Sequence, residues 1–292
     1  MRTGSQYLES LKDGRNVIIN GERVRDVTTH PAFSGVSRSL ASQYDLVARE
    51  SAVLTFPSPS SGQPVAIWHL MPRSQEDLKR RRIGLCRYAD ASYGLIGRGP
   101  DLMGSFFAGF ASAPEVFARK RAEFGTNIVR FQEKMREEDL YVTCAYIPPQ
   151  IDRSKTAHEQ VEPNLVASVV QERDGGIVIR GAQMLATGAA ISDFLHLTSV
   201  VPLRPGDEDH AISLVVPIGA PGLKLYVRRG YAQNQPSVFD YQLSCRFDET
   251  DALVVFDDVF VPWEHVFVYR DLEMPAAFCY CLKVGGLKMR FS

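Results

Sequence analysis

The hydrophobic period of this chain changes near residue 139, and that change limits the folds open to it. Upstream, apolar residues recur three and four positions apart, as on one face of a helix. Downstream, they alternate with polar residues, as in half-buried strands. Helices followed by many short strands indicate separate helical and β regions rather than βαβ units. We therefore predict an α+β protein with a helical domain over residues 1–138 and an antiparallel β-barrel or sandwich over residues 139–270.

The first strand of the β region is predicted to end in a rigid, polar corner. Residues 141–147 are rich in β-branched and aromatic side chains, which favour a sheet. The two prolines at 148–149 cannot continue a ladder, so the chain must leave the sheet there. Residues 150–153 follow as a polar turn. Two interpretations stay open: a corner that binds a cofactor, or a sheet-edge corner whose Asp and Arg pair only with each other.

Local signals place the elements of the helical region. The Asn20-Gly21 dipeptide between apolar runs predicts a hairpin. Ser74 and Asp77 form a capping-box-like helix start. We expect helices over residues 6–13, 34–49, 74–93 and 103–110, a long helix from 114, and an exposed loop over 55–64. In the helix over 74–93, the buried stripe is expected at Leu78, Leu85, Ala89 and Tyr93, and residues 79–82 are expected to be solvated. In the long helix from 114, the buried stripe is expected at Phe117, Phe124, Ile128, Phe131 and Met135.

The β region contains short alternating segments between turn signals. Asp174-Gly175-Gly176 predicts a hairpin between two of them. Strands are expected over residues 141–147, 166–171, 177–181, 194–201, 212–216, 223–227, 252–256 and 266–269.

Composition excludes several classes of function. At 292 residues and a net charge of −1, the chain gives no electrostatic case for nucleic acid or an acidic membrane surface. No apolar run approaches the length of a membrane span. Five scattered cysteines do not make a disulfide framework and favour a reducing cytoplasm. Cys279 and Cys281 are poorly spaced for zinc, and we expect no metal site.

Most sequence motifs that carry chemistry are missing. The sequence has no phosphate-binding P-loop, no HExxH and no nucleophile elbow, and the glycines at 94–99 do not follow a strand. The histidines are isolated, and His210 and His265 are expected at the surface. Arg98 lies in a Gly-flanked loop between helices, where its charged fork could hold a carboxylate, a phenolate or a flavin oxygen, or could cap a helix end. Thr187 follows a strand and offers a hydroxyl beside exposed backbone.

Five segments in order resemble the large oxygenase component of the 4-hydroxyphenylacetate 3-hydroxylase family, from about residue 7 to 271. The segments cover residues 26–33, 97–101, 147–153, 244–252 and 259–271. The resemblance implies an acyl-CoA-dehydrogenase-like fold with an N-terminal helical domain, a central β-barrel and a C-terminal four-helix domain. It also implies a homotetramer that takes reduced FAD from a separate flavin reductase. With O₂ this would give a flavin C4a-hydroperoxide, which hydroxylates a small aromatic, usually phenolic, substrate.

The resemblance also assigns residues. Gln150, Ile151, Asp152 and Arg153 match the flavin-binding turn, Thr187 the flavin-contacting hydroxyl, and Arg98 the arginine of the substrate pocket. Two pocket positions depart from the phenol-hydroxylating members, because Leu102 stands where they carry Tyr and Cys144 where they carry His. Leu102 cannot form hydrogen bonds and a thiol is a weak donor, so the expected substrate is aromatic or heteroaromatic rather than necessarily a simple phenol.

A third departure concerns the end of the chain. After residue 271 the sequence no longer follows the family pattern, so residues 271–292 are expected to be the truncated or frame-shifted start of the C-terminal helical region. The alternative to an active oxygenase is therefore an inactive homologue that binds flavin weakly or not at all. The related 4-hydroxybutyryl-CoA dehydratases place cysteines around residues 98–102, where this chain has none. Acyl-CoA dehydrogenation lacks a visible catalytic carboxylate motif.

Overall fold

The computed structural model describes residues 1–162, 164–232, 237 and 239–273. Cys279 and Cys281, and most of the 271–292 segment, lie outside this part of the chain. Its α-helices are α1 Gly4–Ser10, α2 Ser34–Arg49, α3 Ser51–Leu54, α4 Gln75–Asp90, α5 Pro100–Ala111, α6 Pro114–Phe117, α7 Ala122–Glu137 and α8 Ser244–Phe247. Short 3-10 helices are η1 Ile67–His69, η2 Ala189–Ile191, η3 Glu208–His210 and η4 Trp263–His265.

The strands form two larger sheets and one small hairpin. Their bounds are β1 Asn16–Ile19, β2 Glu22–Val24, β3 Thr55–Pro57, β4 Pro64–Ala66, β5 Val142–Ala145, β6 Ser168–Arg173, β7 Gly176–Thr187, β8 Phe194–Thr198, β9 Ile212–Pro217, β10 Leu223–Val227, β11 Asp251–Pro262 and β12 Val266–Tyr269. One sheet has the order β2-β1-β10-β11-β7-β6, and the other has the order β12-β9-β8-β5. Most neighbours are antiparallel, but β1–β10 and β5–β8 are parallel pairs.

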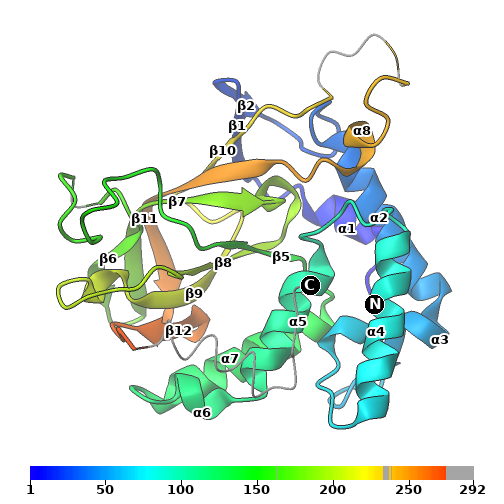
Figure 1. Ribbon diagram of the computed structural model, residues 1–292, viewed down its shortest axis with the longest axis horizontal. Coiled ribbons are helices and arrows are strands. Elements are labelled where there is room, and N and C mark those ends of the chain that lie inside the picture. Colours follow the sequence, from blue (N-terminus) through cyan, green and yellow to red (C-terminus); the bar gives the residue numbers. More distant parts are fainter. Residues whose placement is uncertain (163, 233–236, 238, 274–292) are drawn as a thin grey trace.

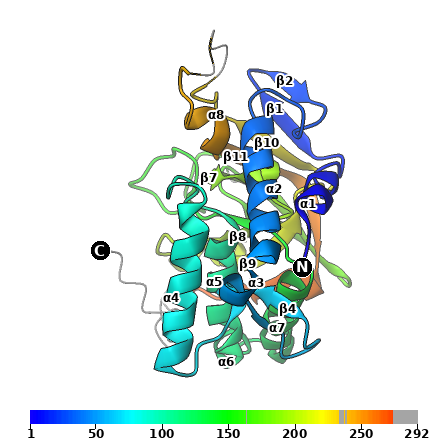
Figure 2. The ribbon, with the colours of Figure 1, turned by 90° about the vertical axis from the view of Figure 1, so that its right-hand side faces the viewer.

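The sheets pack together on one side of the molecule and most helices lie on the other. Figure 1 shows the strands at the left, α1, α2 and α4 at the right, and α5 to α7 below β5. Figure 2, turned by 90°, shows α4 standing on the outside of this helical part. One continuous apolar core joins both sheets to α5 and α7. A smaller core lies between α2, the β3–β4 hairpin, η1 and α4.

Local turn chemistry folds as predicted. Asn20 and Gly21 both have positive φ, 53° and 82°, which a two-residue hairpin turn of this kind requires. Ser74 accepts a bond from the Asp77 N–H and Asp77 accepts one from the Ser74 N–H, which confirms the capping box. The β1–β2 hairpin nevertheless joins the six-stranded sheet through β10, although it lies far upstream of the predicted boundary at residue 138.

The predicted buried stripe of α4 is wrong at both ends, whereas Leu85 and Ala89 in its middle are half-buried and Leu85 packs against the smaller core. Leu78 and Tyr93 are 44% and 70% exposed, whereas Arg81, inside the segment expected to be solvated, is only 3% exposed. Arg81 Nη2 donates to Ser105 Oγ of α5 at 2.9 Å, and α4 also approaches η1 closely. A Cβ on Gly84 would lie 2.7 Å from a methyl of Ile67, so only glycine lets this helix face pack there.

Two further expectations are corrected by tertiary contacts. The ends of the expected 55–64 loop pair as β3 and β4. The long helix from 114 is broken into α6 and α7, although its whole predicted stripe is buried. A Cβ on Gly125 of α7 would lie 2.7 Å from the Pro114 carbonyl oxygen, so the chain folds back closely on itself there.

Of the two predicted surface histidines, His210 is buried and His265 is half-buried. His210 is 6% exposed, because η3 turns its ring inward beside the carbonyl oxygen of Ala167, 3.2 Å from Nδ1. His265 is half-buried against the rings of Phe131 and Phe194. Burial lowers the pKa of both imidazoles.

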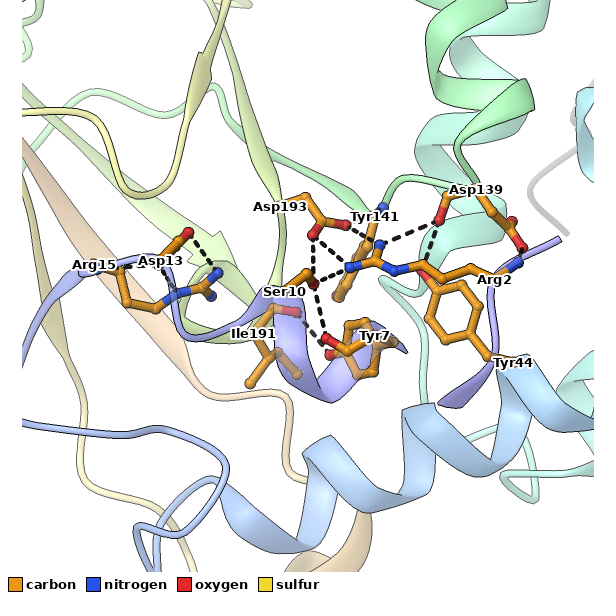
Figure 3. A network of polar contacts seen from close by, with 10 residues as sticks. All are labelled: Arg2, Tyr7, Ser10, Asp13, Arg15, Tyr44, Asp139, Tyr141, Ile191 and Asp193. Atoms are coloured by element: carbon orange, nitrogen blue, oxygen red, sulfur yellow. Dashed lines mark hydrogen bonds and ion pairs between the residues drawn. The ribbon is translucent and has the colours of Figure 1, made fainter. Parts of the chain in front are cut away.

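A polar network ties the N-terminal segment to the β region (Figure 3). The Asp193 carboxylate accepts bonds from the Arg2 guanidinium, at 2.7 and 2.9 Å, and from the Tyr141 N–H, at 2.8 Å. Both side chains of the Arg2–Asp193 pair are 9% exposed. Arg2 Nη1 and Tyr44 Oη both donate to the carbonyl oxygen of Asp139. The network fixes the start of β5, the strand that leads to the predicted site.

Candidate functional site

The loop that carries Arg98 is held by its backbone, while the Arg98 side chain is exposed. The Glu249 carboxylate accepts bonds from the N–H groups of Gly97, at 2.8 Å, and Arg98, at 2.9 Å. Tyr141 Oη donates to the Arg98 carbonyl oxygen at 2.8 Å. The cation is therefore presented from a fixed loop rather than capping a helix end.

Cys144 lies next to Arg98, on β5. The thiol is buried, and burial raises its pKa, while the positive charge of Arg98 acts in the opposite direction. Leu102, half-buried in the first turn of α5, completes the three predicted pocket positions. Asp101 beside it is held partly protonated near neutrality, since burial of its carboxyl group raises the pKa to about 6.

A hydrogen-bonded network of polar side chains runs from the end of β5 into the core beside Cys144. Tyr146 Oη lies 2.7 Å from His196 Nδ1, and His196 Nε2 lies 2.9 Å from Ser213 Oγ. Burial lowers the pKa of His196 to about 3, so the imidazole is neutral at physiological pH. No local pattern could reveal this network, because Tyr146 follows β5 and the other two residues lie on β8 and β9, which become neighbours of β5 only in the sheet.

Thr187 occupies the last position of β7, and its hydroxyl is oriented by a carboxylate. Thr187 Oγ1 donates to Asp251 Oδ1 at 2.5 Å, and its carbonyl oxygen accepts a bond from Thr143 Oγ1. The next residue, Gly188, has φ +72°, and a Cβ there would lie 2.3 Å from Tyr141 Oη. The end of β7 and the Arg98 loop thus share Tyr141 as a neighbour.

The polar corner after β5 is open to solvent at three of its four residues, Ile151 being half-buried. Asp152 accepts bonds from the N–H and hydroxyl of Ser154, which lower its pKa, so the carboxylate is ionised. Arg153 Nη2 donates to Gln150 Oε1 at 3.3 Å. Within the described residues no ion pair joins Asp152 to Arg153, so the interpretation that they pair only with each other is wrong.

A cavity of about 240 Å³ lies between this corner and the loop after β8. Its polar and basic lining includes Arg153, Lys155, Gln183, Thr198, Arg204 and His210. Ile151 also lines it, whereas the walls do not include Arg98, Leu102, Cys144 or Thr187.

The predicted residues therefore form two groups. Arg98 and Cys144 lie together, and Tyr141 connects the Arg98 loop to the end of β7; Ile151 and Arg153 face the separate cavity. Sequence reasoning missed Glu249 and Asp251, although both lie in the 244–252 segment that carried part of the resemblance. The dense acidic run at 248–251 was the available signal.

The described residues contain no candidate metal centre and no helix suited to span a membrane. No group of three or more His, Cys, Asp or Glu side chains there is arranged to hold a metal ion. None of the helices in the same ranges combines the length and apolar character needed to cross a bilayer.

Comparisons with known proteins give consistent relatives. Residues 3–268 match the family described as 4-hydroxyphenylacetate 3-hydroxylase N terminal. The 4-hydroxyphenylacetate 3-monooxygenase oxygenase component of Geobacillus sp. (strain PA-9) is 36% identical over 91% of this chain and 54% of its own length. The 4-nitrophenol 2-monooxygenase oxygenase component of Rhodococcus sp. is 38% identical, over 91% of this chain and 51% of its own. This chain thus spans about half the length of the curated relatives it matches.

Solved structures agree with the sequence matches. The 4-hydroxyphenylacetate 3-monooxygenase oxygenase component complexed with FAD and 4-hydroxyphenylacetate has a TM-score of 0.86 and 34% identity, over 98% of this chain and 62% of that chain. An archaeal 4-hydroxybutyryl-CoA dehydratase from N. maritimus shares the fold, with a TM-score of 0.83 at 24% identity, over 97% of this chain and 59% of that one. These likenesses confirm the predicted α+β, acyl-CoA-dehydrogenase-like fold. With the family match covering residues 3–268, the chain belongs to the 4-hydroxyphenylacetate 3-hydroxylase family.

Proposed function

We propose that this chain is the oxygenase component of a two-component monooxygenase that uses reduced FAD to hydroxylate a small aromatic substrate. The observation that carries the proposal is the pairing of a rigidly held cation, Arg98, with an oriented hydroxyl, Thr187, around Tyr141. Relatives of the same family are named as monooxygenase oxygenase components, and one is complexed with FAD and a phenol.

The residues present fit FAD. Because Thr187 Oγ1 donates its proton to Asp251, its lone pairs remain to accept a bond from a flavin N–H. The exposed groups of Gln150, Asp152 and Arg153 offer further donors and acceptors from a turn that Ser154 stiffens. The basic lining of the neighbouring cavity, with Arg153 and Lys155, suits anionic groups of the cofactor or substrate.

When bound, reduced FAD would supply the two electrons for cleaving O₂. One oxygen atom would enter the aromatic ring and the other would leave as water. The residues of this chain would position the substrate and shield the reaction from water. Arg98 would hold a phenolate or carboxylate oxygen of the substrate with its charged fork. Leu102 would form an apolar part of the wall and Cys144 a weakly polar part, and together they would exclude water. We also propose that oxygen transfer passes through a flavin C4a-hydroperoxide.

The proposal includes partners. A separate flavin reductase would supply the reduced FAD, in the cytoplasm, and the assembled enzyme would be a homotetramer. The substrate would be a phenolic or heteroaromatic compound, with 4-hydroxyphenylacetate and 4-nitrophenol as first candidates because relatives are named for them.

The test combines binding and turnover. Purified protein is titrated with dithionite-reduced FAD, then mixed with oxygenated buffer and each candidate phenol, and ring hydroxylation is followed by mass spectrometry with ¹⁸O₂. We expect one ¹⁸O in the product, and loss of product in Arg98→Ala but not in Arg73→Ala, an exposed arginine outside the site. Failure to retain flavin, with peroxide as the sole product, would favour the inactive homologue.

A further inference from the structure

We propose that Glu249 is the positioning residue of this site: its side chain fixes the Arg98 loop and its main chain ties that loop to the flavin end of β7. The inference rests on the proposed function for the roles of Arg98 and Thr187. The clamp itself is a feature of this chain that can be tested without substrate or flavin.

The side chain of Glu249 makes a two-point contact with the loop. Its Oε2 accepts from the Gly97 N–H and its Oε1 from the Arg98 N–H, across 152 and 151 residues of sequence. Gly97 and Gly99 flank Arg98, and glycine-flanked backbone loses much conformational freedom when it is ordered. Two charge-assisted bonds to consecutive N–H groups offset that loss, and each is stronger than a neutral hydrogen bond.

Tyr141 holds the same loop from the other side. Its hydroxyl donates to the Arg98 carbonyl oxygen. The backbone N–H and the carbonyl group of Arg98 are therefore both held by residues from outside the loop. The exposed guanidinium lies beside Cys144 and is open to a ligand. Loss of the Glu249 contacts would therefore misplace the cation without removing it.

The main chain of Glu249 extends the clamp to β7. The Gly188 N–H donates to the carbonyl oxygens of Glu249, at 2.8 Å, and Thr250, at 3.0 Å. Asp251, two positions on, accepts the bond from the Thr187 hydroxyl. Residues 249–251 therefore join the predicted substrate cation to the predicted flavin hydroxyl in one short segment.

The electrostatics make this clamp sensitive to pH. Burial raises the pKa of Glu249 to about 7. The bonds from the Gly97 and Arg98 N–H groups oppose the rise, the Asp101 carboxyl adds to it, and the Arg98 charge opposes it. The other titratable groups that face it, the Tyr88 and Tyr141 hydroxyls, are neutral, since burial raises the pKa of both far above the usual range. The nearby carboxylates of Asp248 and Asp251 both form ion pairs with Arg228.

Protonation would weaken one arm of the clamp. A carboxylate offers two equivalent acceptors, whereas a neutral carboxyl group offers one good acceptor and an O–H donor. One of the two N–H bonds is therefore weakened as the pH falls through about 7.

The first experiment follows the Gly97 and Arg98 amides by ¹⁵N NMR as the pH is varied, using the whole wild-type chain. We expect both resonances to move together with a midpoint near 7, and the midpoint to vanish in Glu249→Gln, which keeps the shape but does not titrate. Asp248→Asn is the matched control, because this neighbouring carboxylate binds Arg228 and the Tyr231 N–H instead. Amide shifts that ignore pH, or respond equally in Glu249→Gln, would overturn the clamp.

The second experiment measures ligand binding with 4-nitrophenol, whose ionised form absorbs in the visible. At pH 8 we expect Glu249→Gln to weaken binding about tenfold, the size of one charge-assisted hydrogen bond, and Asp248→Asn to leave it unchanged. Wild-type affinity should fall below pH 7 more steeply than in Glu249→Gln. Equal affinities and profiles in the two proteins would overturn the positioning role. If the wild type binds no phenol at all, the proposed function fails, and the amide titration alone decides the clamp.

Discussion

Single side chains in this protein owe their chemistry chiefly to burial. Cys144, His196 and Glu249 all have pKa values moved against their charged forms by loss of water, and only Cys144 and Glu249 have Arg98 as a compensating charge. The charge on Cys144 and Glu249 therefore depends on the balance between burial and the positive charge of Arg98.

The buried Cys144 thiol should react slowly. Only the thiolate is alkylated, and burial both raises the pKa of Cys144 and blocks access. With iodoacetamide at pH 7.5, peptide mass spectrometry should find Cys86 and Cys245, which are exposed, alkylated at least ten times faster. Arg98→Met should slow Cys144 further, because the opposing positive charge is lost. Equal rates at the three cysteines would contradict the buried, high-pKa thiol.

The Thr187 hydroxyl should matter for FAD binding. Thr187→Val keeps the shape but removes both the bond donated to Asp251 and the bond expected with the flavin. Loss of the flavin bond, worth about 1 kcal/mol, should lower FAD affinity about fivefold. Affinity is measured by quenching of flavin fluorescence. Thr29→Val, at an exposed position, is the control. Were both variants to bind FAD as the wild type does, the predicted role of Thr187 would be wrong.

Elements meet here through glycines that admit close neighbours. Gly84 lets α4 approach η1, and Gly125 lets α7 approach α6. Gly188 ends β7 in a left-handed conformation directly against Tyr141. Because Tyr141 also holds the Arg98 loop, the way β7 ends bears on the site.

Replacing Gly188 should separate backbone strain from steric contact. Gly188 and Gly62 have φ values of +72° and +69°, but a Cβ meets Tyr141 Oη at 2.3 Å only at Gly188, since nothing lies within 4 Å at Gly62. Gly62→Ala should cost about 1–2 kcal/mol of unfolding free energy, from left-handed strain alone. Gly188→Ala should cost clearly more in urea unfolding. Equal losses would show that Tyr141 yields without cost.

At the scale of the whole molecule, the Arg2–Asp193 network joins the first helix to the strands (Figure 3). Both side chains are 9% exposed, and removing one partner of a buried pair leaves an uncompensated charge. An exposed pair of similar geometry, Arg180–Asp258, is 47% and 51% exposed and should contribute little.

Asp193→Asn should therefore destabilise the fold by about 3–5 kcal/mol, whereas Asp258→Asn should cost less than about 1 kcal/mol. Urea unfolding followed by circular dichroism measures both. If the helical and β parts are coupled through this network, Asp193→Asn should also broaden the transition. A loss no larger than that of Asp258→Asn would mean that the network contributes little to stability.

The sequence by itself determined the elements and their local turns. The Asn20-Gly21 turn, the Ser74–Asp77 capping box and the presence of strands after residue 139 depend on interactions within a few residues, so their patterns are legible in the chain. The expected alternation is wrong for β5, β8, β9 and β12, which are buried on both faces because they lie inside the packed sheets. The resemblance supplied the family, which the match over residues 3–268 confirms. The assigned roles of Arg98, Cys144 and the 150–153 turn remain predictions.

Tertiary structure decided what those elements bury and what holds the site. Periodicity marked Arg81 as solvated, but in the fold it is buried and its Nη2 donates to Ser105 Oγ of α5. No local pattern could join Glu249 to Arg98, because the two are 151 residues apart and meet only when the end of β7 and the loop before α5 pack on Tyr141. Hydrogen bonds between distant segments depend on the packing of the whole chain, so only the folded molecule shows them.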